Sequence, residues 1–199
     1  PKSDRKREPI RSFDGDARPG EPFWNWRVRN ANEEEYDPEL EFYGYISEYS
    51  WWEDDITPKK FKDELYTNGQ GGPITIRINS GGGEVVAASV IRSILSDYPG
   101  KKTVRIDGMC ASAAVAVALA GDQIQAQDTA YMMIHNPMYS FFLATLNAED
   151  MLKLASELEI FKSGILDAYQ NRTGLDREEL SRMCTDETWM TAAQAKELG

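Results

Sequence analysis

The sequence predicts an α/β fold whose sheet is largely parallel. From about residue 40 onward, short segments of alternating or continuous apolar residues recur, and such segments are typical of strands. Between them stand segments whose apolar residues repeat at three- and four-residue spacing, as in amphipathic helices. Strands that alternate with helices in this way imply a mostly parallel sheet covered by helices. A chain of 199 residues is long enough for one such domain with a full core.

The first half of the domain is expected to alternate strand and helix twice. The segment 41–47 (EFYGYIS) has the composition of a strand, and Thr57 followed by Pro58 is a typical helix start, with the helix running to residue 66. In 74–79 (ITIRIN) apolar residues alternate strictly, which predicts a second strand. The glycine run 81–83 is then expected to form a loop before an amphipathic helix at 84–96.

The second half begins with another strand and contains one long helix. Asn147 is the expected cap of that helix, which carries an apolar stripe at helical spacing. The stripe fits packing against the domain's own core or contact with another subunit. The expected elements are, in order, strand 103–107, helix 112–120, strands 123–126 and 131–135, and helices 147–171, 176–183 and 192–198.

The chain is expected to divide into a charged, flexible N-terminal arm, 1–35, and a single domain, 36–199. The first 20 residues carry six basic and four acidic side chains and almost no apolar ones, so they have little to bury. This arm is interpreted as a solvated tail, although its basic character also suits docking on an acidic partner. Because a parallel sheet would normally continue with a strand after the last helix, the C-terminal end of the domain is expected to be shortened.

Composition excludes several classes of function. The net charge of −11 argues against a nucleic-acid-binding protein, which normally presents a basic face. The longest strongly apolar stretch, 111–120, is too short to span a bilayer, and no secretion signal precedes the domain, so a cytoplasmic protein without membrane contact is expected. Cys110 and Cys184 are interpreted as reduced thiols. With one histidine in the chain, a metal site of several histidines is excluded, and neither metal nor cofactor is expected.

Ser112 is the first candidate for chemistry. It follows a strand that ends near Gly108 and precedes a helix made almost wholly of alanine and valine. A serine there presents its hydroxyl beside a helix N-terminus, where backbone N–H groups favour a developing negative charge. The residue also fits the role of an ordinary N-cap, which is serine's commonest use at this position.

Three further segments complete the requirements of a Ser-His-acid system. The glycine run 81–83 can cradle an oxyanion, or it can be a flexible turn, and it is not a P-loop because no Gly-Lys-Ser/Thr follows. His135 ends an apolar strand, at the edge where α/β proteins place their sites. Asp186 and Glu187 offer two adjacent carboxylates. A serine hydroxyl needs a neighbouring base, and the base needs an acid that orients it.

These segments, in this order and spacing, resemble the ClpP family of serine peptidases, the proteolytic subunits of caseinolytic-type proteases. INSGGGEVVAA is similar to the family's I-N-S-P-G-G segment, with Gly81 in place of the usual proline. GMCASAAVAVALAG is similar to the nucleophile segment G-x-A-A-S-M-[GA], with Cys110 and Ala113 where alanine and methionine are common. YMMIHNP resembles M-I-H-[QN]-P, and TDETWMTAAQAKELG resembles the closing R-D-x-[FW]-[LM]-[ST]-A-x-E-A segment. The resemblance covers 41–199 and implies repeated β-β-α units, as in the related crotonase fold, with a protruding long helix.

By position, the resemblance implies a role for each candidate residue. Ser112 matches the nucleophile, His135 matches the general base, and the backbone N–H groups of Gly82 and Ala113 match the oxyanion hole. The glycine-rich strand, including Gly81 and Gly83, would lie beside an extended substrate.

Two neighbouring residues are candidates for the acid of the triad. Counting back four residues from Thr191 places Glu187 at the family's aspartate position. Asp186 has the expected residue type but lies one place early, and it stays the alternative.

The resemblance also implies a polypeptide substrate, no cofactor, and a homo-oligomeric ring, typically a heptamer and often stacked in pairs. Housekeeping members act in the bacterial cytoplasm with an AAA+ unfoldase. Here the family's usual axial-loop sequence is absent, and tryptophans cluster at positions 24, 26, 51 and 52. WWEDDITPKKF and ETWMTA are more similar to the ClpP-related head maturation proteases of tailed bacteriophages, which act in the procapsid of an infected host on capsid or scaffold proteins.

Two other functions remain open at this point, and a third is disfavoured. A crotonase-like enzyme would use the same fold and a glycine-rich oxyanion hole on acyl-CoA thioesters. A catalytically inactive ring or scaffold protein would retain the motifs without the activity. A membrane-associated signal-peptide peptidase with a Ser-Lys dyad fits less well, because His135 is present and a membrane segment is not.

Overall fold

The computed structural model describes residues 23–27, 38–47, 58–141 and 143–199. Its centre is one seven-stranded sheet in the order β1-β2-β3-β4-β6-β7, with β5 pairing separately with β4. The pairs among β2, β3, β4, β5 and β6 are parallel, and the outer pairs β1–β2 and β6–β7 are antiparallel. The mostly parallel α/β fold predicted from the sequence is therefore confirmed.

The strands and helices follow the expected order closely. The strands are β1 (Asn25–Arg27), β2 (Glu39–Ile46), β3 (Ile74–Gly83), β4 (Lys102–Ala111), β5 (Gln123–Ala126), β6 (Tyr131–Ile134) and β7 (Thr188–Thr191). The helices are α1 (Pro58–Gly69), α2 (Val85–Asp97), α3 (Ala113–Ala118), α4 (Ala148–Thr173), α5 (Arg177–Thr185) and α6 (Ala192–Leu198). The expected N-cap of α1, Thr57, lies outside the described residues.

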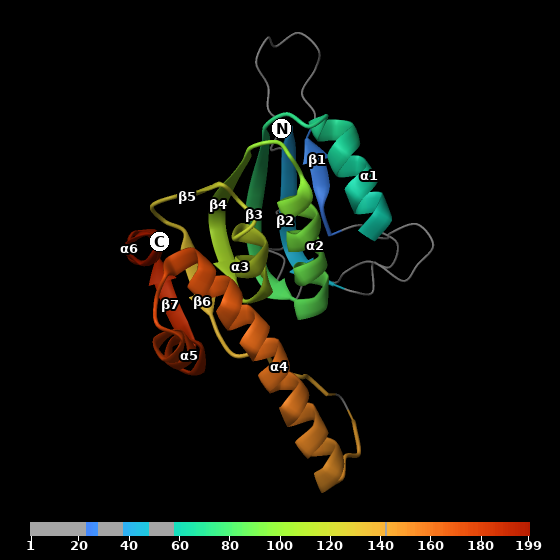
Figure 1. Cartoon of the computed structure of the whole chain (residues 1–199), viewed down its shortest axis with the longest axis vertical. Coiled ribbons are helices and arrows are strands. Elements are labelled where there is room, and N and C mark those ends of the chain that lie inside the picture. The colour runs from blue at the N-terminus through green and yellow to red at the C-terminus, as the bar shows by residue number, and fades with distance from the viewer. Residues whose placement is uncertain (1–22, 28–37, 48–57, 142) are drawn as a thin grey trace, which may run out of the picture.

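The core lies between one face of the sheet and helices α1, α2 and α3 (Figure 1). Along β3, alternate residues Ile74, Ile76 and Ile78 are buried, because the strand period of two sends them all to the helix-covered face. Ile91 and Leu95 of α2 are buried in the same cluster. The strict alternation seen in the sequence is thus the pattern of a sheet buried on this face.

The glycine run does not form the expected loop. Gly82 and Gly83 belong to β3 and pair with Tyr45 and Ile46 of β2. A β-carbon on Gly83 would lie 1.9 Å from the carbonyl oxygen of Ile46, so two backbones approach here at a distance that only glycine allows. The expectation of a loop was wrong because strand pairing, a long-range contact, outweighs the low strand propensity of glycine.

Two short strands were not expected from the sequence, β1 and β7. β1 lies inside the region expected to be an arm, yet Trp24, just before it, is 3% exposed and packs edge-to-face on Phe61 of α1. The indole N–H of Trp24 donates a hydrogen bond to Glu64. Residues 23–27 are therefore part of the folded domain, while the rest of the expected arm, 1–22 and 28–35, lies outside the described residues.

The opposite face of the sheet carries a polar cluster. Arg77 makes two hydrogen bonds to Asp107, at 2.9 and 2.8 Å, and the hydroxyl of Tyr43 donates a third at 2.7 Å. Burial alone would raise the pKa of Asp107, but the hydrogen bonds from Arg77 and Tyr43 lower it below its ordinary value. Burial and the bond to Asp107 together raise the pKa of Tyr43 to about 12. The cluster joins β2, β3 and β4 just before they reach the site described below.

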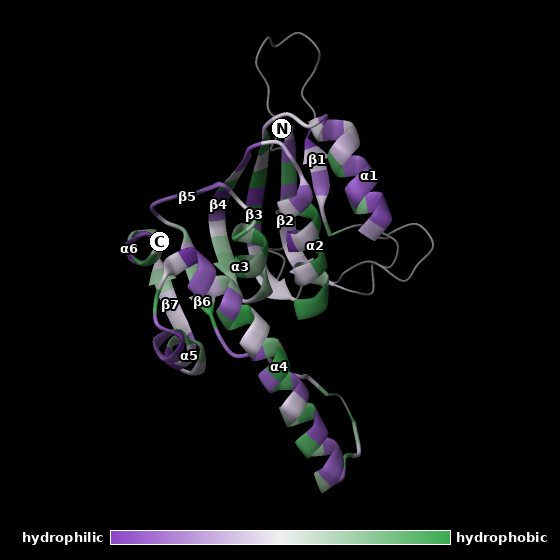
Figure 2. Cartoon of the chain, viewed as in Figure 1, coloured by the Kyte–Doolittle hydropathy of each residue, from purple (hydrophilic) through white to green (hydrophobic). Residues whose placement is uncertain are grey.

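Helix α4 extends beyond the rest of the domain (Figure 1). It begins at a capping box in which Asn147 and Asp150 each accept the other's backbone N–H, and it ends at Gly174, whose left-handed backbone (φ 70°) closes the last turn. Only its C-terminal half is anchored, with Leu166, Ala168 and Tyr169 buried. In the protruding half, which alternates polar and apolar residues (Figure 2), Met151 of the predicted apolar stripe is exposed, and so are Leu152 and Ile160 outside the stripe.

Candidate active site

Ser112 lies at the junction of β4 and α3 in an unusual backbone conformation. Its φ of 55° and ψ of −127° fall in a region that residues other than glycine rarely occupy. The backbone N–H of Ser112 donates to Met133 of β6 at 2.8 Å, which ties the junction to the strand that precedes His135. The hydroxyl makes no helix-capping bond, so the N-cap interpretation left open by the sequence does not hold. The side chain is instead free to point toward its neighbour.

That neighbour is His135. The Ser112 Oγ and the His135 Nε2 are 2.6 Å apart, within hydrogen-bonding distance. The contact follows from the sheet, because β4 and β6 are parallel and Ala111 pairs with Met133. Both side chains therefore leave the sheet at the carboxyl ends of adjacent strands. The structure thus brings together the serine and the histidine that the sequence singled out.

Gly82 packs directly against this junction. Its φ is 102°, and a β-carbon there would lie 2.6 Å from the Ser112 β-carbon, 2.7 Å from the Ala111 carbonyl oxygen and 3.0 Å from the Ala113 nitrogen. The backbone N–H of Gly82 donates to the hydroxyl of Ser80 at 3.1 Å, so this donor already has a partner in the structure. Gly82 and Ala113 are brought together, as the sequence predicted, but an oxyanion would have to share or replace the bond to Ser80. Ser80, which belongs to the I-N-S segment, was not singled out from the sequence.

The two candidate acids lie on the turn between α5 and β7. Asp186 is the C-cap of α5, and Glu187 has a left-handed backbone, with φ of 49°. β7 pairs antiparallel with β6, and the pair Ile134–Thr188 leaves His135 and Glu187 at the next positions along the two strands. Among the described residues, neither carboxylate forms a hydrogen bond with His135. The structure places the turn next to the histidine and leaves the choice between the two acids open.

A small cavity of about 30 Å³ adjoins the serine and histidine. Apart from these two and Ser89, its lining is apolar and mostly small. The other lining residues are Val85, Ala88, Ala113, Ala116, Pro137, Ile165 and Tyr169. The cavity has room for no more than a small group beside Ser112.

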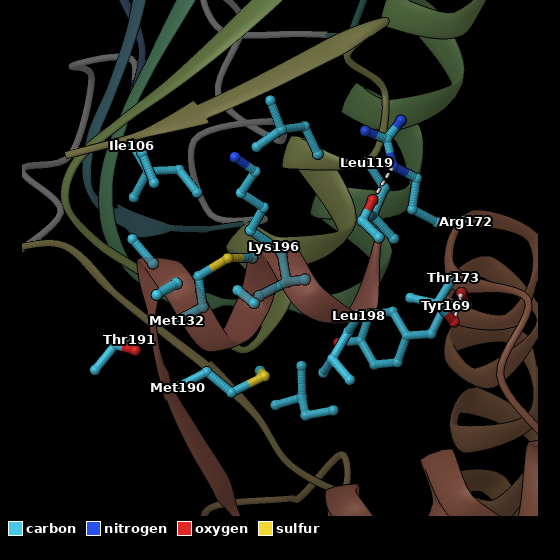
Figure 3. A pocket seen from close by; sticks show the side chains of 18 of the residues that line it. Ile106, Leu119, Met132, Tyr169, Arg172, Thr173, Met190, Thr191, Lys196 and Leu198 are labelled. Carbon is cyan, nitrogen blue, oxygen red and sulfur yellow. Dashed lines mark hydrogen bonds between the residues drawn. The ribbon is translucent and has the colours of Figure 1, made fainter. Parts of the chain in front are cut away.

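A second, much larger cavity of about 950 Å³ contains neither Ser112 nor His135 (Figure 3). It lies among β5, β6, α6 and the end of α4, and its walls are mostly apolar, with Met132, Met190 and Leu198 around it. Tyr169 lines both cavities and so forms a wall between them. Burial raises the pKa of its hydroxyl far above the ordinary value, which keeps the phenol neutral. The sequence did not indicate that Tyr169 would line both cavities; it showed only that Tyr169 lies at helical spacing from Ile165.

Neither a metal site nor a membrane-spanning helix is found in the part of the chain that the structure describes. No group of three or more histidine, cysteine or carboxylate side chains is arranged there to hold an ion. No described helix combines the length and the apolar character needed to cross a bilayer.

Comparison with known proteins assigns the family. Residues 64–199 match the profile of the Clp protease family, and this region contains all the candidate site residues. The chain belongs to the Clp protease family. Membership favours the peptidase interpretation over crotonase-like acyl-CoA chemistry, and it agrees with the resemblance found in the sequence.

Individual members of the Clp protease family match over most of the domain. ATP-dependent Clp protease proteolytic subunit 1 of Chlamydia abortus is 32% identical over 147 residues, which is 73% of this chain and 75% of the relative. The subunit of the same name from Chlamydia muridarum is 32% identical over 138 residues, covering 68% of this chain and 70% of the relative. Among solved structures, a mutant of ClpP1 from Listeria monocytogenes has a TM-score of 0.68 at 23% identity, and the match covers 81% of this chain and 86% of that one. This likeness confirms the ClpP-type fold.

Proposed function

We propose that this member of the Clp protease family is a serine endopeptidase in which Ser112 is the nucleophile and His135 the general base. The observation that carries the proposal is the 2.6 Å contact between the Ser112 Oγ and the His135 Nε2 at the ends of two parallel strands. The backbone strain at Ser112 supports it, because such strain is often found where a side chain must be held in position for chemistry.

In the proposed mechanism, the hydroxyl of Ser112 attacks the carbonyl carbon of a peptide bond while the Nε2 of His135 takes its proton. The histidine then gives this proton to the leaving amine, and a water molecule, activated by the same histidine, hydrolyses the acyl-enzyme. Backbone N–H groups of Ala113 and Gly82 would stabilise the oxyanion, with Gly82 releasing or sharing its bond to Ser80. Glu187, or alternatively Asp186, would orient the imidazole. The extended substrate would lie along the strand that contains Gly81 and Gly83.

A ring-shaped homo-oligomer is part of the proposal. The protruding half of α4 and the segment before it expose apolar side chains that the domain itself leaves uncovered, including Met138, Phe141, Leu143, Leu152 and Ile160. Large apolar groups gathered in one region mark a protein–protein contact. We assign this contact to a second copy of the chain, in a heptameric ring or a stacked pair of rings.

The same peptidase chemistry could serve in two biological settings, which differ in the partner protein. The Chlamydia relatives are named as subunits of ATP-dependent proteases, and by analogy an AAA+ unfoldase in the bacterial cytoplasm would deliver the polypeptide. The segments WWEDDITPKKF and ETWMTA instead favour a phage protease that cleaves capsid or scaffold proteins in the procapsid. A protease of the second kind is expected to cleave its substrate without ATP or an added unfoldase.

Peptide hydrolysis by the purified full chain tests the proposed function. Wild-type protein and Ser112→Ala are compared on unfolded casein and on a fluorogenic peptide with a small apolar residue before the cleaved bond. The assembly state is followed in parallel by sedimentation velocity. Cleavage by wild type that is lost in Ser112→Ala supports the proposal. An assembled wild type that cleaves neither substrate would favour a catalytically inactive ring or scaffold protein.

A further inference from the structure

The pairing between β6 and β7 ends at the active site, where the histidine strand meets the end of α5. β6 and β7 pair regularly as far as Ile134 and Thr188. If the register continued, Asn136 would lie opposite Asp186, but its backbone N–H donates to the carbonyl of Cys184 at 3.1 Å. Cys184 belongs to the last turn of α5, so the ladder ends at Ile134 and Thr188, and the histidine strand continues against the end of this helix. Asp186 and Glu187, the two candidate acids, form the turn that joins α5 to β7.

One carbonyl group holds the base of this turn. The oxygen of Cys184 accepts from the N–H of Asn136 and also from the N–H of Glu187, at 3.3 Å. Asn136 follows the histidine directly in the chain. The backbone next to the base and the backbone of the favoured acid therefore meet at a single atom.

A side-chain hydrogen bond holds the turn at a second point. The Nδ2 of Asn136 donates to the hydroxyl of Thr185 at 3.3 Å, and that hydroxyl donates to the carbonyl of Ser181 at 2.9 Å. Because the hydroxyl proton is used for Ser181, Thr185 can only accept from Asn136, and this fixes the orientation of the amide. The Oδ1 of Asn136 is buried and has no hydrogen-bond partner among the described residues. The amide is thus held in place by its nitrogen alone.

We propose that Asn136 and Thr185 are positioning residues that hold the turn carrying Asp186 and Glu187 against the end of the histidine strand. Two bonds to consecutive residues at the end of α5, Cys184 and Thr185, hold the backbone that leads into the turn. The inference rests on the proposed function, because the acid matters only if His135 acts as a base.

A pair of threonines with the same bonding provides the test. Thr185→Val keeps the shape and removes the hydroxyl, whereas Thr185→Ser keeps the hydroxyl. Thr173→Val is the matched control, because the hydroxyl of Thr173 also donates to the carbonyl four residues earlier, at 2.9 Å, and accepts one N–H, from Leu175 at 3.2 Å. Thr173 does not line the small cavity at Ser112. The two valine variants lose the same number of hydrogen bonds, so their stabilities, measured by urea unfolding, are expected to fall alike.

The first readout is the rate at which a fluorophosphonate labels Ser112 in the full chain, measured across pH. We expect Thr185→Val to slow labelling by about 10- to 100-fold, the size of effect that a displacement near 1 Å produces. Thr185→Ser is expected to restore the rate, and Thr173→Val to leave it unchanged. In a Glu187→Ala background, Thr185→Val is expected to have little further effect, because the two residues act through one contact. Equal slowing by both valine variants, or full additivity with both Glu187→Ala and Asp186→Ala, would overturn the inference.

The second readout does not depend on activity. Since the chain has one histidine, a proton NMR signal from an imidazole Nδ1–H bonded to a carboxylate can come only from His135. We expect a low-field resonance of this kind in wild type, its loss in Thr185→Val and its return in Thr185→Ser. Wild type that shows this pattern but is not labelled would contradict the proposed function and support the positioning role. A resonance that is absent from wild type, or that persists in Thr185→Val, would overturn the positioning role.

Discussion

Replacing Gly82 by alanine should disable the site, and the structure indicates why. The new methyl group would lie 2.6 Å from the Ser112 β-carbon and 2.7 Å from the Ala111 carbonyl oxygen. Neither is the end of a flexible side chain, so the backbone around the serine has to move. The φ of 102° adds strain, since residues with a β-carbon rarely adopt it.

The cost can be estimated from these two effects. Backbone strain of this kind costs about 1–3 kcal/mol, and overpacking a buried site costs a further 1–3 kcal/mol or so. We therefore expect Gly82→Ala to lower the free energy of unfolding by about 2–6 kcal/mol. Displacing Ser112 from the imidazole should also slow fluorophosphonate labelling by about 100-fold or more in the protein that stays folded. Urea unfolding measures the first effect, and labelling below the unfolding transition measures the second.

Gly164→Ala is the matched control. Gly164 lies in the middle of α4, and apart from the helix backbone no atom lies within 4 Å of the position of its missing β-carbon. Alanine there should stabilise the protein by about 0.5–1 kcal/mol, because glycine loses more backbone conformational entropy than alanine when the helix forms. If Gly82→Ala were as stable as wild type and labelled as fast, the close packing of Gly82 on the serine junction would be refuted.

The contacts around the site lead to three further predictions. Glu187→Ala should slow labelling of Ser112 by about 10⁴-fold, as loss of a triad acid does elsewhere, whereas Asp186→Ala should leave most of the rate. Ser80→Ala should lower the free energy of unfolding by about 1–3 kcal/mol for each of the two backbone groups that its buried hydroxyl satisfies. Asp107→Asn should reduce the loss of stability in acid. The pKa of Asp107 is lower in the folded protein than in the unfolded chain, so its ion pair with Arg77 stabilises the fold above about pH 4, the usual carboxyl range. This stabilisation is lost as the pH falls through the lowered pKa.

Each of these predictions has its own control and contrary outcome. If Asp186→Ala loses the activity that Glu187→Ala keeps, the acid is the neighbour of the one favoured here. Ser96→Ala removes an exposed serine that bonds only the carbonyl four residues earlier, and a loss of stability as large as that of Ser80→Ala would argue against the buried network. Urea midpoints of wild type and Asp107→Asn that change in parallel from pH 6 to pH 3 would show that the ion pair does not contribute to acid sensitivity.

The elements that could be predicted from the sequence are those specified by patterns of neighbouring residues. The alternation in 74–79 and the capping pattern at Asn147 each specify an element through neighbouring residues, and both elements are present. Ser112 and His135 could be paired from the sequence because both end parallel strands, and such strands end at the same edge of a sheet.

The remaining parts depend on contacts between distant segments. β7 is four residues long and exists because it pairs with β6, more than 50 residues away in the chain. Gly82 and Gly83 form a strand because β2 lies beside them. The choice between Asp186 and Glu187 depends on how the end of α5 is held against Asn136, a contact that no local pattern encodes. Counting along the sequence therefore identified the turn but not the geometry of its carboxylates.

The most direct test of the pairing of Ser112 with His135 is to treat the assembled protein with a fluorophosphonate probe and to locate the adduct by mass spectrometry, with His135→Gln alongside. We predict one adduct, on Ser112, that is lost in the histidine variant, because the hydroxyl is reactive only when the imidazole can take its proton. An adduct on another serine, or labelling of Ser112 that persists without the histidine, would contradict the pairing of these two residues. Absence of any adduct from rings verified by sedimentation would contradict the assignment as an active serine peptidase.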